Sequence, residues 1–240
     1  MLKPFKIKKP DLNFKLRRPK WRMKFRHPNL NGIAHNLHID INKSFKKELY
    51  RKSIHLSSLW IPALIYFLHP GLSIIIFSTL FVGDALLEYG NYKKWPWARR
   101  SFGVLFFKTL RNKELKRNKF QVSGSLYVFL AAIACTFLFT KAIAVVSLTI
   151  MLISDTCAAL FGKAYGTRRL RASKSLEGTV AFFLSALLIM VLYNPILPVT
   201  YASIIAALIA TLTEMYEDKI EIDDNLSIPL FVGITLSILG

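Results

Sequence analysis

Cysteine and acidic residues are both scarce in this sequence of 240 residues. The two cysteines, Cys135 and Cys157, each lie inside an apolar run, which indicates neither a disulfide framework nor a zinc site. The 14 Asp and Glu residues are outnumbered by 33 Lys and Arg residues, so the net charge is +19. No apolar core follows the first charges for about fifty residues, and this excludes a cleavable signal peptide at the start of the sequence.

Hydrophobic residues make up 53% of the chain, a share that a soluble domain rarely combines with so large a positive charge. A polytopic membrane protein combines the two, because its apolar spans alternate with basic loops. Nucleic-acid binding is the other usual interpretation of a high positive charge. It would leave the long apolar runs unexplained, so we expect a membrane protein that does not bind nucleic acid.

The apolar runs predict an all-α transmembrane bundle of about seven spans. A span needs about 20 mostly apolar residues, within a range of about 17 to 25. Seven segments come near this length: 53–68, 71–88, 123–140, 142–162, 177–193, 196–214 and 226–240. The first and the last are the shortest, and the last could span incompletely. Pro70, Pro195 and Pro198 fall in short uncharged connections, which predict tight turns.

The basic residues predict how the bundle is oriented. Every Lys and Arg except Lys141 lies in 1–52, in 89–122, in 163–176 or at Lys219, and all of these fall on one side of the seven spans. The positive-inside rule places that side in the cytoplasm. We therefore expect an integral protein of a bacterial inner membrane or an ER-type membrane, with a cytoplasmic N-terminus and active face.

The segment 1–43 mixes basic residues with Trp21, Met23 and Phe25. Segments of this composition bind anionic lipid surfaces, although a disordered tail would also satisfy the topology rule. We expect a basic cytoplasmic tail over 1–43 and a transmembrane catalytic domain over 44–240.

Polar side chains gather at the predicted cytoplasmic ends of the spans, and the opposite ends have almost none. They are Glu48, Arg51, Lys52 and His55; Asp84 and Glu88; Ser154 and Asp155; Lys174 to Thr179; Glu214; and Asp223 to Asn225. Glu48 could instead pair with Lys52 on a solvated face, and Asp84 and Glu88 could lie at a helix interface. A carboxylate inside a span is costly unless it meets a partner, water or a metal, so Asp155 is a candidate functional residue.

The stretch Lys174-Ser-Leu-Glu-Gly-Thr179 has the composition of a helix start. A serine can cap a helix, and the first N–H groups of the helix attract anions. A glycine lets a ligand approach the backbone, and the lysine favours a phosphate. A phosphate beside carboxylates from several spans implies Mg²⁺ or Mn²⁺, since Mg²⁺ binds one or two carboxylates plus phosphate oxygens.

Four motifs together resemble the CTP-dependent lipid kinases, a family that includes dolichol kinase, phytol kinase and the yeast-type diacylglycerol kinase. They are Arg51-Lys-x-x-His55, Ser154-Asp-Thr-x-Ala-Ala-x-x-Gly-x-x-x-Gly166, Lys174-Ser-x-Glu-Gly-Thr179 and Asp224-Asn-Leu-x-Ile-Pro229. The resemblance covers about 48–230 and leaves out the basic tail. It implies a polytopic enzyme that moves the γ-phosphate of a nucleoside triphosphate, usually CTP, onto a lipid alcohol.

The resemblance and the polar clusters suggest a role for each residue. Mg²⁺ is expected on Asp155 and Asp224, with Glu214 or Asp84 as further ligands. The phosphates are expected at Lys174 and at the N–H groups of Ser175 to Thr179, Gly178 and Thr179 included, with help from Arg51, Lys52 and Asn225. The group that accepts the hydroxyl proton stays open: His55 qualifies by residue type, and Glu177 and Asp84 qualify by position.

Two alternatives remain open from the sequence. The phosphatidate cytidylyltransferases (CDP-diacylglycerol synthases) are similar over the aspartate and lysine-glutamate-glycine motifs, but they typically have threonine where Ser175 follows the lysine here. They attack the α-phosphorus of the same nucleotide. An ion-coupled transporter could also use buried carboxylates, although a translocation path needs polar residues along the whole depth of the membrane. The lipid alcohol itself could be diacylglycerol, a polyprenol or a shorter isoprenoid alcohol.

Overall fold

The structure is a computed structural model, and it describes the chain except for residues 1–42, 99–121, 172–173 and 221. The described residues belong to the compact unit Ile41–Gly240. Of the tail predicted over 1–43, only Lys43 lies within the described residues. The helices of this unit are α1 (Lys43–Ser57), α2 (Trp60–Phe67), α3 (Pro70–Tyr92), α5 (Gly124–Leu138), α6 (Lys141–Tyr165), α7 (Leu176–Leu192), α8 (Tyr201–Met215), α9 (Glu217–Ile220) and α10 (Asp224–Leu239). The expectation of an all-α protein is confirmed for the described residues.

The observed helices follow the predicted apolar segments closely, with two differences at prolines. The segment 53–68 is divided between α1 and α2, because Pro62 has no N–H for the Ser58 carbonyl. That carbonyl accepts a hydrogen bond from the Ile61 N–H instead, at 2.9 Å. The segment 196–214 begins with a turn, in which the Val199 N–H donates to Asn194 Oδ1 at 2.9 Å, and α8 starts only at Tyr201.

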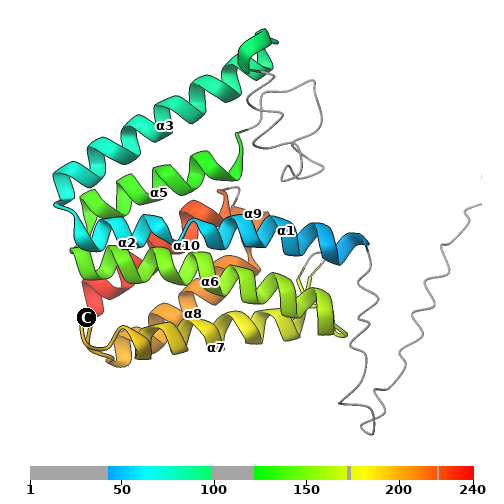
Figure 1. The fold of residues 1–240 in the computed structure, drawn as a ribbon. Helices are drawn as coiled ribbons and strands as arrows, with labels where there is room; N and C mark the ends of the chain where they lie inside the picture. The colour runs from blue at the N-terminus through cyan, green and yellow to red at the C-terminus, as the bar shows by residue number, and fades with distance from the viewer. Residues whose placement is uncertain (1–42, 99–121, 172–173, 221) are drawn as a thin grey trace, which may run out of the picture. The chain divides into compact units, whose positions relative to one another are not determined.

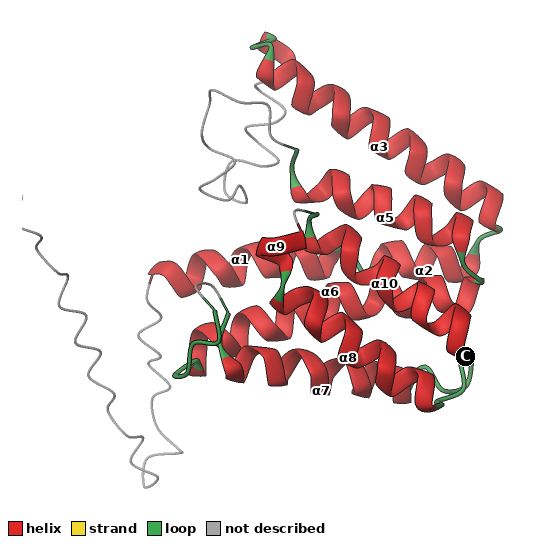
Figure 2. Ribbon diagram, turned by 180° about the vertical axis from the view of Figure 1, so that it is seen from behind, coloured by secondary structure: helices red, strands yellow, loops and turns green. Residues whose placement is uncertain are grey.

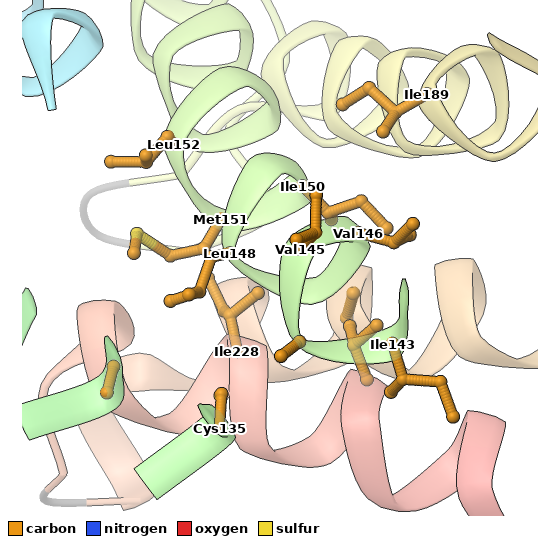
Figure 3. Packing of buried hydrophobic residues seen from close by; sticks show 14 of the residues in the cluster. Cys135, Ile143, Val145, Val146, Leu148, Ile150, Met151, Leu152, Ile189 and Ile228 are labelled. Atoms are coloured by element: carbon orange, nitrogen blue, oxygen red, sulfur yellow. The ribbon is translucent and has the colours of Figure 1, made fainter. Parts of the chain in front are cut away.

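Helix α6 lies at the centre of the bundle. Its residues from Ile143 to Leu152 are all buried, and a helix that is apolar on every side is expected to be enclosed by others. It packs against α1, α2, α5, α7 and α10. Figure 3 shows Leu148 and Met151 on the side of α6 toward Ile228 of α10, and Ile150 on the side toward Ile189 of α7. This packing makes α6 the central helix for α1, α2, α5, α7 and α10.

The helices run antiparallel, so their polar ends lie at one end of the unit. In Figure 1 the last turns of α6 and the first turns of α1 and α7 lie at the same end, and the C-terminus lies at the other. Figure 2 shows α8 beside both α7 and α10, and contacts within the unit agree. Helix α3 packs chiefly against α5. The clusters that the sequence places at span ends are therefore neighbours in space.

Two helices, α3 with 23 residues and α6 with 25, are long and apolar enough to cross a membrane. The other apolar helices, such as α5 with 15 residues and α7 with 17, are shorter than the roughly 20 residues of a typical span. The segments predicted over 123–140 and 196–214 are longer than α5 and α8, because they include apolar residues of the turns. Many large apolar side chains are exposed on the unit, among them Phe67, Phe137 and Ile238.

Candidate functional site

The first part of the candidate site is a buried ion pair between α1 and α6. Lys52 Nζ donates a hydrogen bond to Asp155 Oδ2, and His55 Nε2 lies 3.4 Å from the same oxygen. The Lys52 side chain is only 1% exposed and that of Asp155 is 9% exposed. Lys52 and His55 are three residues apart on α1, so both reach the same side of α6. Lys52 is therefore the partner that the Asp155 carboxylate needs inside an apolar helix.

The second part lies where the chain enters α7. Lys174 Nζ donates to Glu214 Oε1 at 2.6 Å, near the end of α8. It also lies 3.1 Å from Glu217 Oε2, at the start of α9. Burial alone would lower the pKa of Lys174, but the carboxylates of Glu214 and Glu217 outweigh it and hold that pKa above its usual value. Lys174 therefore carries a positive charge at neutral pH.

Asp224, at the first turn of α10, connects these two parts. It lies within electrostatic reach of both His55 and Lys174, and Asp155 lies within reach of Lys174. The central charged cluster therefore consists of residues from five parts of the chain: Lys52, His55, Asp155, Lys174, Glu214 and Asp224. Each was predicted as a site residue, and the structure brings them together at the predicted end of the bundle.

A second group of charges lies outside this cluster, between α1 and the end of α6. Arg51 donates a hydrogen bond to Glu48 Oε1, and Lys163 Nζ donates to Glu48 Oε2 at 3.3 Å. Burial favours the neutral form of Glu48, yet Arg51 and then Lys163 keep the pKa of Glu48 below its usual value. The predicted alternative pairing of Glu48 with Lys52 is not the one observed, because Lys52 points to Asp155.

The start of α7 differs from the expected phosphate cradle. Ser175 Oγ accepts from the Gly178 N–H at 3.2 Å, the Arg168 carbonyl accepts from the Leu176 N–H at 2.9 Å, and the Ser175 carbonyl accepts from the Thr179 N–H at 3.0 Å. These N–H groups are therefore already satisfied by the chain itself. The serine cap was predicted correctly, but it occupies donors that we expected a phosphate to use.

Gly178 has a packing role in this structure. A Cβ at Gly178 would lie 2.7 Å from the Ala158 carbonyl oxygen and 3.1 Å from Gly162 Cα. The two glycines thus allow α6 and α7 to approach closely near their polar ends. A ligand was expected to approach the backbone at Gly178. In the structure, α6 of the same chain approaches it instead.

Glu177 does not join the central charged cluster. Its Oε1 accepts hydrogen bonds from the Thr167 N–H at 2.9 Å, from the Thr167 hydroxyl and from the Arg168 N–H at 3.3 Å. The carboxylate therefore organises the turn between α6 and α7. This geometry does not favour Glu177 as the group that takes a substrate proton.

Asp84 and Glu88 dock α3 onto the start of α5. Asp84 Oδ2 accepts from the Ser125 hydroxyl at 2.7 Å. Glu88 accepts from the Ser123 N–H at 3.2 Å, where it is well placed against the positive end of the α5 dipole. The interface role that the sequence left open for this pair matches the geometry.

Asn225 lies close to the start of α5. Its Nδ2 donates to Asp223 Oδ1, and it would be 3.3 Å from a Cβ at Gly124. Asp223 Oδ1 also accepts from the Asn225 N–H at 3.1 Å and so caps α10. The Asp223-Asp224-Asn225 sequence therefore fixes the start of α10 beside α5 and directs Asp224 toward the cluster.

In the parts of the chain that the structure describes, no three His, Cys, Asp or Glu side chains converge as a metal-binding group. The expected set of Asp155, Asp224, Glu214 and Asp84 is therefore not assembled as a cage. Mg²⁺ needs only one or two carboxylates when phosphate oxygens and waters complete its shell. Asp155 and Asp224, both near His55, fit that smaller requirement.

Sequence analysis missed Glu217, the second carboxylate beside Lys174. It lies three residues after Glu214, at the start of the separate short helix α9. The sixth predicted segment ends at Glu214, so Glu217 falls in the connection that follows it. Following the acidic residues past the end of the apolar run would have identified Glu217 as a candidate.

Comparisons with known proteins place the chain in a family. No family model and no solved structure matches it. It is similar to a protein of Rickettsia prowazekii (strain Madrid E) named "Uncharacterized protein RP860". The two are 34% identical over 196 residues, which cover 78% of this chain and 92% of the Rickettsia protein. The chain therefore belongs to the same family as the Rickettsia protein.

Proposed function

We propose that this protein is an integral membrane kinase that transfers the γ-phosphate of CTP to the hydroxyl of a lipid alcohol. The observation that carries this proposal is the central charged cluster. Two lysines, a histidine and three carboxylates from five parts of the chain are gathered at one end of an otherwise apolar bundle. Buried charges are costly, and their concentration at one depth favours a site of chemistry over a role in stability.

The proposal that the protein is integral to a membrane rests on the length of two helices and on the exposure of apolar side chains. Helices α3 and α6 are long and apolar enough to span, and the exposed large apolar side chains are suited to lipid contact. The shorter helices would complete a seven-span bundle together with their apolar turns. By the positive-inside rule, the basic connections favour the cytoplasmic face for the cluster, where a soluble nucleotide and a lipid hydroxyl would meet.

Lysines 52 and 174 supply positive charge for the triphosphate. Lys174 is held by Glu214 and Glu217, so it stays protonated and positioned before substrate arrives. Asp155 and Asp224 would hold Mg²⁺, which would supply positive charge to offset that of the triphosphate. Phosphoryl transfer depends mainly on such positioning and charge stabilisation, with little covalent work for the protein.

The reaction forms one bond and breaks one. The lipid hydroxyl oxygen attacks the γ-phosphorus, the bond from that phosphorus to the β–γ bridging oxygen breaks, and CDP leaves. The hydroxyl proton passes to His55, the imidazole beside Asp155 at 3.4 Å. Asp155 orients the ring and stabilises the charge it gains. His55 is preferred to Glu177 and Asp84 because both of these carboxylates are engaged elsewhere.

The test is lipid phosphorylation by the purified full chain in detergent, with CTP, Mg²⁺ and a panel of lipid alcohols. Phosphorylated lipid identified by mass spectrometry is the expected product. Asp155→Asn keeps the size of the side chain and should abolish product formation, whereas the matched change Asp218→Asn, at an exposed residue of α9, should preserve it. Full activity of Asp155→Asn would refute the assigned site.

A further inference from the structure

Backbone contacts in the connection between α6 and α7 hold Lys174 close to residues that precede it. The Lys174 carbonyl accepts a hydrogen bond from the Leu170 N–H at 3.1 Å and another from the Arg171 N–H at 3.2 Å. Next to this pair, Arg169 and Ser175 form an antiparallel β-bridge. The backbone of Lys174 is therefore attached directly to that of Arg171.

The side chain of Arg171 lies on the ring of Tyr216, which follows α8. The guanidinium carbon of Arg171 is 4.4 Å from the centre of the ring, and Lys219 Nζ is 5.9 Å from the same centre. A cation is attracted to an aromatic face within about 6 Å of the ring centre, and the cation is more often Arg than Lys. Arg171 is therefore attached to Tyr216 by its side chain as well as to Lys174 by its backbone.

Tyr216 lies between the two carboxylates that hold Lys174. Glu214 precedes it near the end of α8, and Glu217 follows it at the start of α9. The Tyr216 carbonyl accepts a hydrogen bond from the Lys219 N–H at 2.8 Å, which ties Tyr216 to α9. The aromatic ring and both carboxylates are thus carried by one short segment, the joint between α8 and α9.

The connection is attached to this joint at two points. The first is the Lys174 ammonium, which donates to Glu214 Oε1 at 2.6 Å and lies 3.1 Å from Glu217 Oε2. The second is the contact of Arg171 with Tyr216. A phosphate that binds the ammonium would compete with the carboxylates and weaken the first attachment. The second attachment uses an aromatic ring, so the same phosphate would leave it intact.

We propose that Arg171 and Tyr216 are positioning residues, whose contact holds Lys174 in place in the central charged cluster. The inference rests on the proposed function, because it is there that Lys174 serves the triphosphate. Arg171 and Tyr216 act through Lys174. An aromatic face is enough to attract the guanidinium, so phenylalanine should replace Tyr216 and leucine should not.

The first test measures how firmly Lys174 is held and needs no nucleotide. The full protein in detergent is treated briefly with a trace of acetic anhydride, and mass spectrometry gives the acetylation of Lys174 relative to that of Lys141, at the opposite end of α6 from the cluster. Tyr216→Leu should raise this ratio about threefold. Tyr216→Phe should leave it unchanged, and so should the matched control Tyr201→Leu, at an exposed residue at the start of α8.

The second test asks whether Arg171 acts through Tyr216 or binds phosphate itself. Arg171→Leu, Tyr216→Leu and the double variant remove the same contact, so all three should raise the acetylation of Lys174 equally. Each should lower kcat for lipid phosphorylation about tenfold through misplacement of Lys174. If Tyr216→Leu does not fold, Arg171→Leu and Tyr216→Phe decide the question. A much larger loss of kcat in Arg171→Leu than in Tyr216→Leu would show direct phosphate binding and overturn the proposal.

The two measurements separate this proposal from the proposed function. Unchanged acetylation of Lys174 in Tyr216→Leu would overturn the positioning role, whatever the activity. If acetylation rises as expected but the unchanged protein phosphorylates no lipid alcohol, the positioning role stands and the kinase proposal fails. If lipid is phosphorylated while Tyr216→Leu matches Tyr201→Leu in both acetylation and kcat, the kinase proposal stands and the positioning role fails.

Discussion

Lys52 and Asp155 form a buried ion pair although 103 residues separate them in the chain. The pair joins α1 to the central helix, and His55 shares the same carboxylate oxygen. Because an unpaired buried charge is costly, we expect Lys52→Met to lower the free energy of unfolding by about 3 kcal/mol. Thermal unfolding in detergent measures this loss.

The double variant Lys52→Met with Asp155→Asn separates stability from chemistry. It leaves no buried charge unpaired at this position, so most of the lost stability should return. Activity should stay absent, because both proposed phosphate and metal contacts are gone. Recovery of activity together with stability would show that the pair is structural only.

Lys174→Met should reduce lipid phosphorylation by about 10²–10³-fold, since the transition state loses a preorganised positive charge. The change also leaves Glu214 without its ammonium partner. Lys163→Met is the matched control, because Lys163 contacts Glu48 at 3.3 Å outside the central charged cluster. Equal losses in the two variants, measured as kcat at saturating CTP, would contradict the role of Lys174.

Gly178→Ala should destabilise the bundle by about 1–3 kcal/mol, because the added methyl group meets the Ala158 carbonyl at the α6–α7 contact. Gly83→Ala, with nothing within 4 Å of its added Cβ, should leave stability unchanged or raise it slightly. The two unfolding midpoints in detergent give the comparison. Matching midpoints would show that α6 and α7 do not pack closely at Gly178.

Membrane orientation can be tested with single cysteines in a variant that lacks Cys135 and Cys157. An impermeant thiol reagent outside intact cells should label a cysteine at Pro195, in the turn before α8. It should not label one at Arg169, in the basic turn before α7, which the positive-inside rule places in the cytoplasm. Labelling at Arg169 would reverse the orientation and remove the cytoplasmic active face.

Much of the fold was predictable, because apolar runs and prolines determine where helices begin and end. The predicted segment 71–88 lies inside α3, and the predicted 177–193 differs from α7 by one residue at each end. The break before α2 was missed because a single proline changes the mean hydropathy of a long apolar run only slightly. Its effect is on hydrogen bonding, which composition does not record.

The candidate site was predicted as a set of residues and not as a set of pairs. The sequence places Asp155 and Lys174 at the same end of the bundle, and the structure agrees. It could not show that Lys52 is the partner of Asp155 and Glu214 that of Lys174, because periodicity gives the face of a helix but not its neighbour. Glu177 illustrates the same limit, since the short connection between α6 and α7 brings Thr167 next to its carboxylate.

The most direct test of the proposed function is to follow the α-phosphate and the γ-phosphate of CTP separately. Purified protein is incubated with a panel of lipid alcohols and with CTP labelled at the γ-phosphate or, in a separate reaction, at the α-phosphate. A lipid kinase transfers the γ label to the lipid and releases CDP, and this is the result we expect. If the α label enters the lipid and pyrophosphate is released, the protein is a cytidylyltransferase and the proposed function is wrong.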